Sequence, residues 1–150
     1  MIAQVDDLDR IMSVMAAAFD PGFGEAWNRR QVDDALVLGK CHYGLAQADG
    51  ECAGFYLSRF ALDEEELLLL GVIPQQRGRG YGALLLETFM AEALARGARR
   101  VLLEMRQGNP AERLYSRYGF KQIGTRPNYY RGTNGQQIDA QTFAFELHGD

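Results

Sequence analysis

A glycine-rich turn is the part of the sequence whose residue types most clearly suggest chemistry. Glycines allow backbone N–H groups to converge on a ligand, and a helix N-terminus adds about half a positive charge. Two arginines within the turn add fixed positive charge. We therefore expect the turn to bind a phosphate or pyrophosphate through Arg77, Gly78, Arg79, Gly80, Tyr81 and Gly82.

The turn has three alternative interpretations. A Walker A loop needs Gly-Lys-Ser/Thr, and the turn contains no lysine. A Rossmann fingerprint fits Gly78, Gly80 and Ala83, with Glu104 placed 21 residues further on. The residues after Glu104 carry signals of paired strands rather than repeated βαβ units, which disfavours that fold. A tight turn with incidental glycines is the purely structural alternative.

Glu104 is the main candidate for proton transfer. It interrupts the apolar run Val101–Met105, and a carboxylate in such a strand needs either partners or a raised pKa. The structural alternative is a strand-end glutamate paired with Arg106 or Arg99. Both interpretations are kept open at this point.

The N-terminal half must supply part of the scaffold for these residues. Apolar residues between Val5 and Phe19 recur at helical spacing, with Asp6 or Asp7 available as N-cap, and residues 20–24 should break the helix. A second helix is expected from its cap Asn28 to Leu38, ending at Gly39. Strands are then expected at Cys41–Ala48 and Glu51–Phe60, joined by a type I′ turn at Asp49-Gly50.

The rest of the chain predicts one β–α–β crossover and a closing strand pair. The charged run Asp63–Glu66 is expected to be a solvated loop before a buried strand at Leu67–Ile73. A helix from Gly80 to Arg96 should face inward through Tyr81, Leu84, Leu85, Thr88, Phe89 and Leu94. The remaining expected elements are a strand at Arg100–Met105, a short helix between Pro110 and Gly119, and strands at Phe120–Thr125 and Ile138–Leu147 with a turn at Asn134-Gly135. This order predicts an α/β sandwich around a mixed sheet.

Composition limits the class of protein. The 150 residues are 47% hydrophobic and 24% charged, which is typical of one globular domain spanning residues 1–150. The net charge of −4 disfavours a nucleic-acid binder that works by bulk positive charge. No apolar run is long enough for a membrane span, and the acidic N-terminus does not read as a signal peptide, so we expect a cytoplasmic protein. Cys41 and Cys52 are expected to be buried thiols, and no metal site is expected.

Two motifs together resemble the GNAT acetyltransferase superfamily. The first is Val72-Ile73-Pro74 followed by Arg77-x-x-Gly80-x-Gly82 and a helix, and the second is Asn109-x-Ala111-x-x-Leu114-Tyr115-x-x-x-Gly119-Phe120. The resemblance implies a mixed, mostly antiparallel sheet with helices on both faces and one β-α-β core that binds acyl-CoA. It also implies acetyl-CoA as co-substrate, with the turn on its pyrophosphate, Val72 and Ile73 beside its acyl end and Asn109 on its pantetheine arm.

A narrower resemblance concerns the bacterial ribosomal-protein-alanine N-acetyltransferases. It rests on Trp27-Asn28, Leu103-Glu104-Met105-Arg106, Arg126-x-Asn128-Tyr129-Tyr130, Gly135 and Asp139-Ala140. The sequence departs from that family's pattern at Ala26, where the family tends to have proline, and in Leu69–Ile73, where the family is more polar. The resemblance implies an acceptor that is the N-terminal alanine of a small-subunit ribosomal protein.

The same resemblance implies a role for each candidate residue. Glu104 would act as general base through a water molecule, and Tyr115 would protonate the departing thiolate. A backbone N–H near Val72 would polarise the thioester carbonyl. The walls of the acceptor groove would be Trp27, Tyr129 and Tyr130.

Acceptor chemistry mildly favours an α-amine. Its reference pKa of about 7.7–8.0, against about 10.4 for lysine, makes the neutral amine about 3.4 kcal/mol more accessible at pH 7. We therefore predict a protein Nα-acetyltransferase, a monomer or weak dimer, in which acetyl passes directly to the amine within a ternary complex. The alternatives are a GNAT enzyme acting on a small amine or amino acid, and a non-catalytic acyl-CoA-binding module, which should lack Glu104 or Tyr115.

Overall fold

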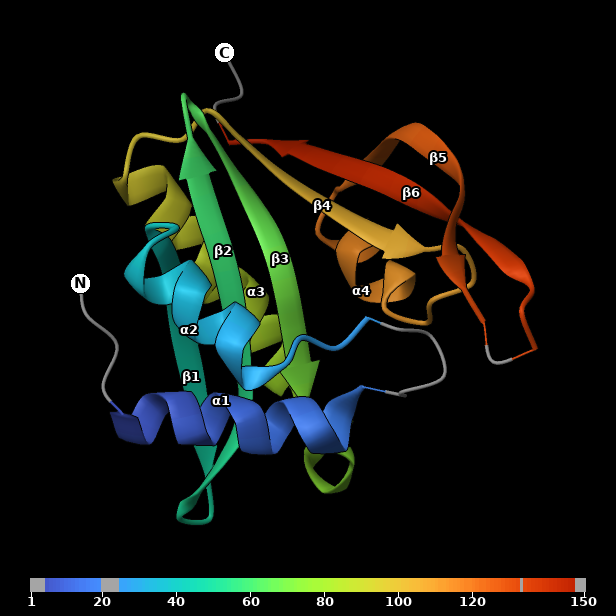
Figure 1. Ribbon diagram of the computed structural model, residues 1–150. Helices are drawn as coiled ribbons and strands as arrows, with labels where there is room; N and C mark the ends of the chain where they lie inside the picture. The colour runs from blue at the N-terminus through green and yellow to red at the C-terminus, as the bar shows by residue number, and fades with distance from the viewer. Residues whose placement is uncertain (1–4, 20–24, 133, 148–150) are drawn as a thin grey trace.

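The computed structural model describes residues 5–19, 25–132 and 134–147. Within these residues six strands form one sheet in the order β1-β2-β3-β4-β6-β5 (Figure 1). The strands are β1 (Cys41–Ala48), β2 (Glu51–Ala61), β3 (Glu64–Val72), β4 (Arg100–Arg106), β5 (Lys121–Arg131) and β6 (Gln137–Glu146). Strands β3 and β4 pair in parallel and all other neighbours are antiparallel. The predicted mixed, mostly antiparallel sheet is confirmed.

Helices cover both faces of this sheet, as expected. Figure 1 shows α1 (Val5–Ala18) and α2 (Arg29–Val37) on one face, with α3 (Tyr81–Ala95) and α4 (Glu112–Arg117) on the other. A short 3-10 helix, η2 (Pro74–Gln76), precedes the glycine-rich turn. Each face has its own apolar cluster, one packed against α1 and α2 and one against α3 and α4. In the described residues no helix is long and apolar enough to cross a membrane.

Several expected boundaries are confirmed by local geometry. Asp49 and Gly50 have φ of 53° and 80°, which fits the type I′ turn between β1 and β2. Asn28 caps α2 through a capping box, because its side chain accepts from the Gln31 N–H while Gln31 accepts from the Asn28 N–H. Helix α3 ends near Gly97, whose φ is 97°.

Other expectations were wrong. Helix α1 begins at Val5, so Asp6 and Asp7 lie within its first turn and neither is the N-cap; the expected break at residues 20–24 lies outside the described residues. On α3, Leu84 and Leu94 are 50% and 44% exposed, because the helix packs on the sheet through Leu85, Leu86, Phe89 and Ala93. Strand β5 continues beyond Thr125 to Arg131, because its pairing with β6 resumes after a bulge.

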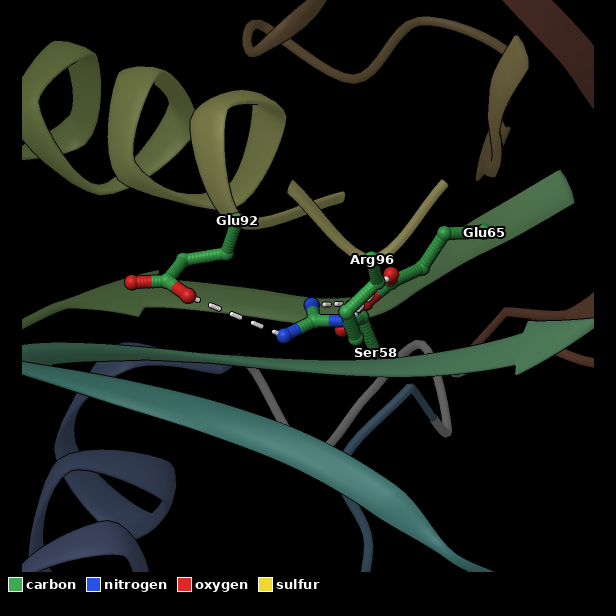
Figure 2. Close-up of polar contacts among 4 residues, drawn as sticks. All are labelled: Ser58, Glu65, Glu92 and Arg96. Atoms are coloured by element: carbon green, nitrogen blue, oxygen red, sulfur yellow. Dashed lines mark hydrogen bonds and ion pairs between the residues drawn. The ribbon is translucent and has the colours of Figure 1, made fainter. Parts of the chain in front are cut away.

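The acidic run is not a solvated loop. Strand β3 begins at Glu64, and strand alternation directs Glu65 into the interior, where its side chain is 0% exposed. There the Arg96 Nε donates to Glu65 at 2.8 Å and the Ser58 hydroxyl donates to the same carboxylate (Figure 2). Glu92, one turn before Arg96 on α3, lies 3.8 Å from the guanidinium. The buried carboxylate therefore ties the C-terminal end of α3 to β2 and β3.

We expect Arg96→Met to destabilise the fold by about 3 kcal/mol, because it leaves the Glu65 charge buried without its cation. Arg100→Met is the matched control. It breaks the neighbouring pair with Glu64, whose side chains are 34% and 36% exposed, and should cost about 1 kcal/mol or less. Urea unfolding measures the free energy of unfolding of both variants. Equal losses would show that the buried pair contributes no more to stability than the exposed pair.

Candidate active site

The two parallel strands separate at the centre of the sheet. Pairing between β3 and β4 runs only from Glu64↔Arg100 to Leu67↔Leu103. At that point the register of β3 with β2 also shifts, because Ser58 pairs with Leu67 while Leu57 pairs with Leu69. Beyond that point β3 remains paired with β2 and β4 with β6, so the C-terminal ends of β3 and β4 diverge (Figure 1). We call this divergence of β3 and β4 the wedge.

Val72 ends β3 at the open end of the wedge, and Ile73 follows it. The Ile73 N–H donates to the Ala53 carbonyl of β2 at 2.8 Å. Since successive N–H groups of a strand point to opposite sides, the Val72 N–H points toward the wedge. The geometry therefore fits the predicted role of a backbone N–H near Val72 as a donor to a bound carbonyl.

The glycine-rich turn joins η2 to the start of α3. Gly78 and Gly80 have φ of 78° and 90°, a conformation that favours glycine, and Gly80 is the N-cap of α3. A Cβ added at either would have no protein atom within 4 Å, so the space beside both is open. The space beside Gly82 is occupied instead, because a Cβ there would lie 3.4 Å from the Leu114 side chain of α4.

The two arginines of the turn bond to the protein itself. Arg77 donates to the Val72 carbonyl at 3.1 Å and to the Ala18 carbonyl at 2.8 Å. Arg79 donates to the Gln76 side chain at 3.2 Å. Their charges stay beside the turn, but the groups that point to open space are the N–H groups at the start of α3, which have no partner within the helix. Tyr81, the first residue of α3, is half-buried against the cluster on that face.

Asn109 precedes α4. Its side-chain oxygen accepts from the Ala111 N–H at 2.9 Å, so it fixes the chain where the helix starts. It also lines an open hollow with Gly108, Pro110, Glu112, Arg113 and Ser116. A capping role and the predicted contact with a pantetheine arm are compatible in this geometry.

Glu104 projects from the face of the sheet that α1 and α2 cover. Val101, Leu103 and Met105 of β4 pack into the cluster of the opposite face, so alternation places Glu104 and Arg106 together on this one. The carboxylate of Glu104 accepts from Thr142 at 3.3 Å and pairs with the Arg126 guanidinium at 3.3 Å. The carboxylate is therefore partnered as the structural alternative required, but by Arg126 and not by Arg106 or Arg99.

Strand β5 brings two aromatic rings to Glu104. Its bulge sets three residues of β5 opposite one of β6, and the Asn128 N–H, at φ 56°, donates to Asp139 at 2.9 Å. The Arg126 guanidinium lies 4.6 Å from the centre of the Tyr129 ring, and the Tyr129 and Tyr130 rings are 5.0 Å apart. The structure therefore places both tyrosines beside the carboxylate that Arg126 holds.

Electrostatics links the same groups. Burial first, and then the charges of Glu104 and Glu25, raise the pKa of Tyr130 to about 12. Tyr130 is therefore a neutral, half-buried phenol at neutral pH.

Tyr115 approaches from the opposite face. It lies on α4, is almost fully buried and contacts Phe120 edge to face at 5.8 Å. Burial, and after it the charge of Glu25, raises the pKa of Tyr115 well above its ordinary value. The hydroxyl therefore keeps its proton at neutral pH.

The predicted site residues thus fall into two groups, one on each face of the sheet at the wedge. The turn, Asn109 and Tyr115 lie with α3 and α4, while Glu104, Tyr129 and Tyr130 lie with the opposite face. Trp27 is half-buried in the cluster of α1 and α2. A ligand held at the turn could present its reactive end through the wedge to a second ligand beside Glu104.

Sequence reasoning missed the roles of three polar residues around Glu104. They are Glu25, Arg126 and Thr142. Arg126 stands within a motif already noted, but nothing in that motif indicates its contact with Glu104. Glu25 has no sequence signal, because its partner is 81 residues away.

The sequence is similar to those of known acetyltransferases. The sequence model of the acetyltransferase (GNAT) family matches residues 8–120. The [ribosomal protein bS18]-alanine N-acetyltransferase of Haemophilus influenzae is 31% identical over 99 residues, covering 66% of this chain and 68% of that protein. Its Escherichia coli counterpart is 36% identical over 90 residues, covering 59% and 61%.

Solved acetyltransferase structures share the fold of this chain over nearly its full length. The crystal structure of the Escherichia coli ribosomal-protein-S18-alanine N-acetyltransferase superposes with a TM-score of 0.86 at 26% identity, covering 100% of this chain and 94% of that one. An aminoglycoside 6'-N-acetyltransferase complexed with coenzyme A shares the fold, with a TM-score of 0.81 at 16% identity and coverage of 98% and 94%.

Proposed function

The chain belongs to the acetyltransferase (GNAT) family and is an N-acetyltransferase, and from that premise we propose that it acetylates the N-terminal amine of a protein. The first candidate acceptor is the N-terminal alanine of a small-subunit ribosomal protein. The named relatives at 31% and 36% identity support this acceptor. The observation that carries the proposal is the placement of Glu104, with Arg126 and the two tyrosines, across the wedge from Tyr115 and the glycine-rich turn.

The residues fit acetyl-CoA as the donor. Open space at Gly78 and Gly80, with N–H groups at the start of α3, suits a pyrophosphate. We assign the pantetheine arm to the side of Asn109, which lines an open hollow at the start of α4. The Val72 N–H then faces the thioester carbonyl and stabilises negative charge on its oxygen as the amine attacks.

Each proton and bond is accounted for by this chain's residues. Glu104, through a water molecule, takes a proton from the acceptor ammonium and passes it to solvent, and the neutral amine attacks the thioester carbon. The new N–C bond gives a tetrahedral adduct, which loses its second nitrogen proton to the Glu104 carboxylate as the C–S bond breaks. Tyr115 gives its proton to the departing thiolate and regains one from solvent.

We propose that the transfer is direct, within a ternary complex. Burial raises the pKa of both Cys41 and Cys52, so neither thiol readily provides a thiolate nucleophile at neutral pH. Cys41 is also buried on β1, and β1 lies three strands from β4 in the sheet. The amine itself is therefore the nucleophile.

The acceptor class is tested by steady-state kinetics with saturating acetyl-CoA. An alanine-starting peptide should give kcat/KM at least about 100-fold above polyamines, free amino acids and aminoglycosides, a difference of about 2.7 kcal/mol in transition-state binding. The same peptide with a blocked N-terminus is the control and should be inert. A small amine that exceeds the peptide would move the acceptor to the small-molecule class.

A further inference from the structure

A short segment crosses in front of the wedge. Residues 25–28, here called the strap, lead into α2, and Figure 1 shows this coil starting beside the end of β4 and passing in front of the C-terminal end of β3. The strap therefore lies on the face that carries Glu104. An acceptor that approaches Glu104 on this face must pass it.

An ion pair joins the strap to β4. The Arg106 Nε lies 3.4 Å from a Glu25 carboxylate oxygen, and their side chains are only 17% and 16% exposed. Arg106 is two residues from Glu104 and on the same face of β4. The pair therefore fixes the strap directly beside the proposed general base.

The other end of the strap is fixed as well. Trp27 packs into the apolar cluster of α1 and α2, which includes Leu69 and Ile73 of the β3 side of the wedge. Asn28 is held by the capping box of α2. Glu25 is paired with Arg106 of β4, and Trp27 packs on the cluster to which β3 contributes. The strap therefore links the two strands that diverge.

The Glu25 carboxylate also lies near the candidate site. After burial, its charge raises the pKa of both Tyr115 and Tyr130, so it lies within electrostatic reach of both phenols. On β5, the Arg126 guanidinium stacks on Tyr129 and pairs with Glu104. On the proposed function, an acceptor beside Glu104 lies between the strap and β5, in a space here called the acceptor channel.

We propose that Glu25 is a positioning residue for the acceptor: its ion pair with Arg106 holds the strap across the wedge and sets the width of the acceptor channel beside Glu104. Glu25 acts through the position of the strap and takes no proton in the reaction. The inference rests on the proposed function, because it assumes that the acceptor enters on the face of Glu104.

The test separates acceptor binding from chemistry. We expect Glu25→Gln to raise the acceptor KM about tenfold while kcat and the Kd of CoA stay within about twofold, because ground-state and transition-state contacts are lost equally. Arg106→Met should give the same increase, and the double variant should add little, since either change alone breaks the pair. Arg106→Lys, which keeps the charge, should restore the acceptor KM to within about threefold of wild type.

Glu66→Gln is the matched control, because it removes a pair of the same 3.4 Å length, with Arg59, at a more exposed position. Its acceptor KM should equal that of wild type. If Glu25→Gln does not fold, the acceptor KM of Arg106→Met compared with that of Arg106→Lys tests the positioning role by itself.

An unchanged acceptor KM in Glu25→Gln, or single effects that multiply in the double variant, would overturn the positioning role. Failure of the proposed function looks different. A wild-type enzyme that ignores peptides but acetylates another amine would refute the peptide acceptor, while the KM comparison on that amine would still test the strap.

Discussion

Glu104→Gln is expected to lower kcat for peptide acetylation by about 10²- to 10⁴-fold, the usual contribution of a general base. The amide keeps the size of the side chain and can still bond Thr142, but it cannot take a proton. The loss should be greatest below about pH 7, where an α-amine with a pKa of about 7.7–8.0 is mostly protonated. Steady-state rates between pH 6 and 9 measure it.

Tyr115→Phe tests the opposite side of the wedge and should also lower kcat by about 10²-fold or more. It removes one hydroxyl and keeps the ring that packs on Phe120. Tyr118→Phe is the matched control on α4, because the Tyr118 hydroxyl donates to Glu87 on α3 and lies outside the proposed site. If Glu104→Gln and Tyr115→Phe both retain activity within about threefold of wild type, the acid and base assignments are wrong.

Gly80→Ala should abolish the binding of CoA. Gly80 has φ 90° and open space beside it, so an added methyl group would occupy the space that we assign to the pyrophosphate. CoA at about 100 times its wild-type Kd should add about 2.7 kcal/mol to the stability of the wild type and nothing to that of the variant. Thermal unfolding with and without CoA measures the difference, and NAD should have no effect on either protein.

Gly97→Ala is the matched control for backbone strain. Gly97 lies just beyond the other end of α3, has φ 97° and likewise has no atom within 4 Å of an added Cβ. Both variants therefore carry a similar strain of about 1 kcal/mol, but only Gly80→Ala should lose the response to CoA. Equal responses in the two variants would remove the turn from the cofactor site.

Features that depend on neighbouring residues could be predicted from the sequence. The type I′ turn at Asp49-Gly50, the cap at Asn28 and the positions of the glycines follow from backbone preferences that act over a few residues. The mixed, mostly antiparallel sheet and the helices on both faces followed from the order of the elements and the family resemblance. The structure confirms each of these.

Features that depend on distant pairing could not be predicted. Nothing in Asp63–Glu66 shows that Arg96, at the end of α3, will meet Glu65 inside the protein, so the run looked like a solvated loop. The partner of Glu104 could not be identified for the same reason, because Arg126 reaches it only through the register of β5 with β6 and of β6 with β4. The wedge itself is set by where β3 and β4 stop pairing, which no local pattern encodes.

The most direct test of the central claim is to locate the acetyl group on a product. The wild-type enzyme is mixed with acetyl-CoA and a peptide that starts with alanine and contains one internal lysine, and the product is fragmented by tandem mass spectrometry. The account predicts a single acetyl group on the α-nitrogen of the alanine, with no product from Glu104→Gln in the same time. Acetylation of the lysine instead, or an equal yield from Glu104→Gln, would contradict it.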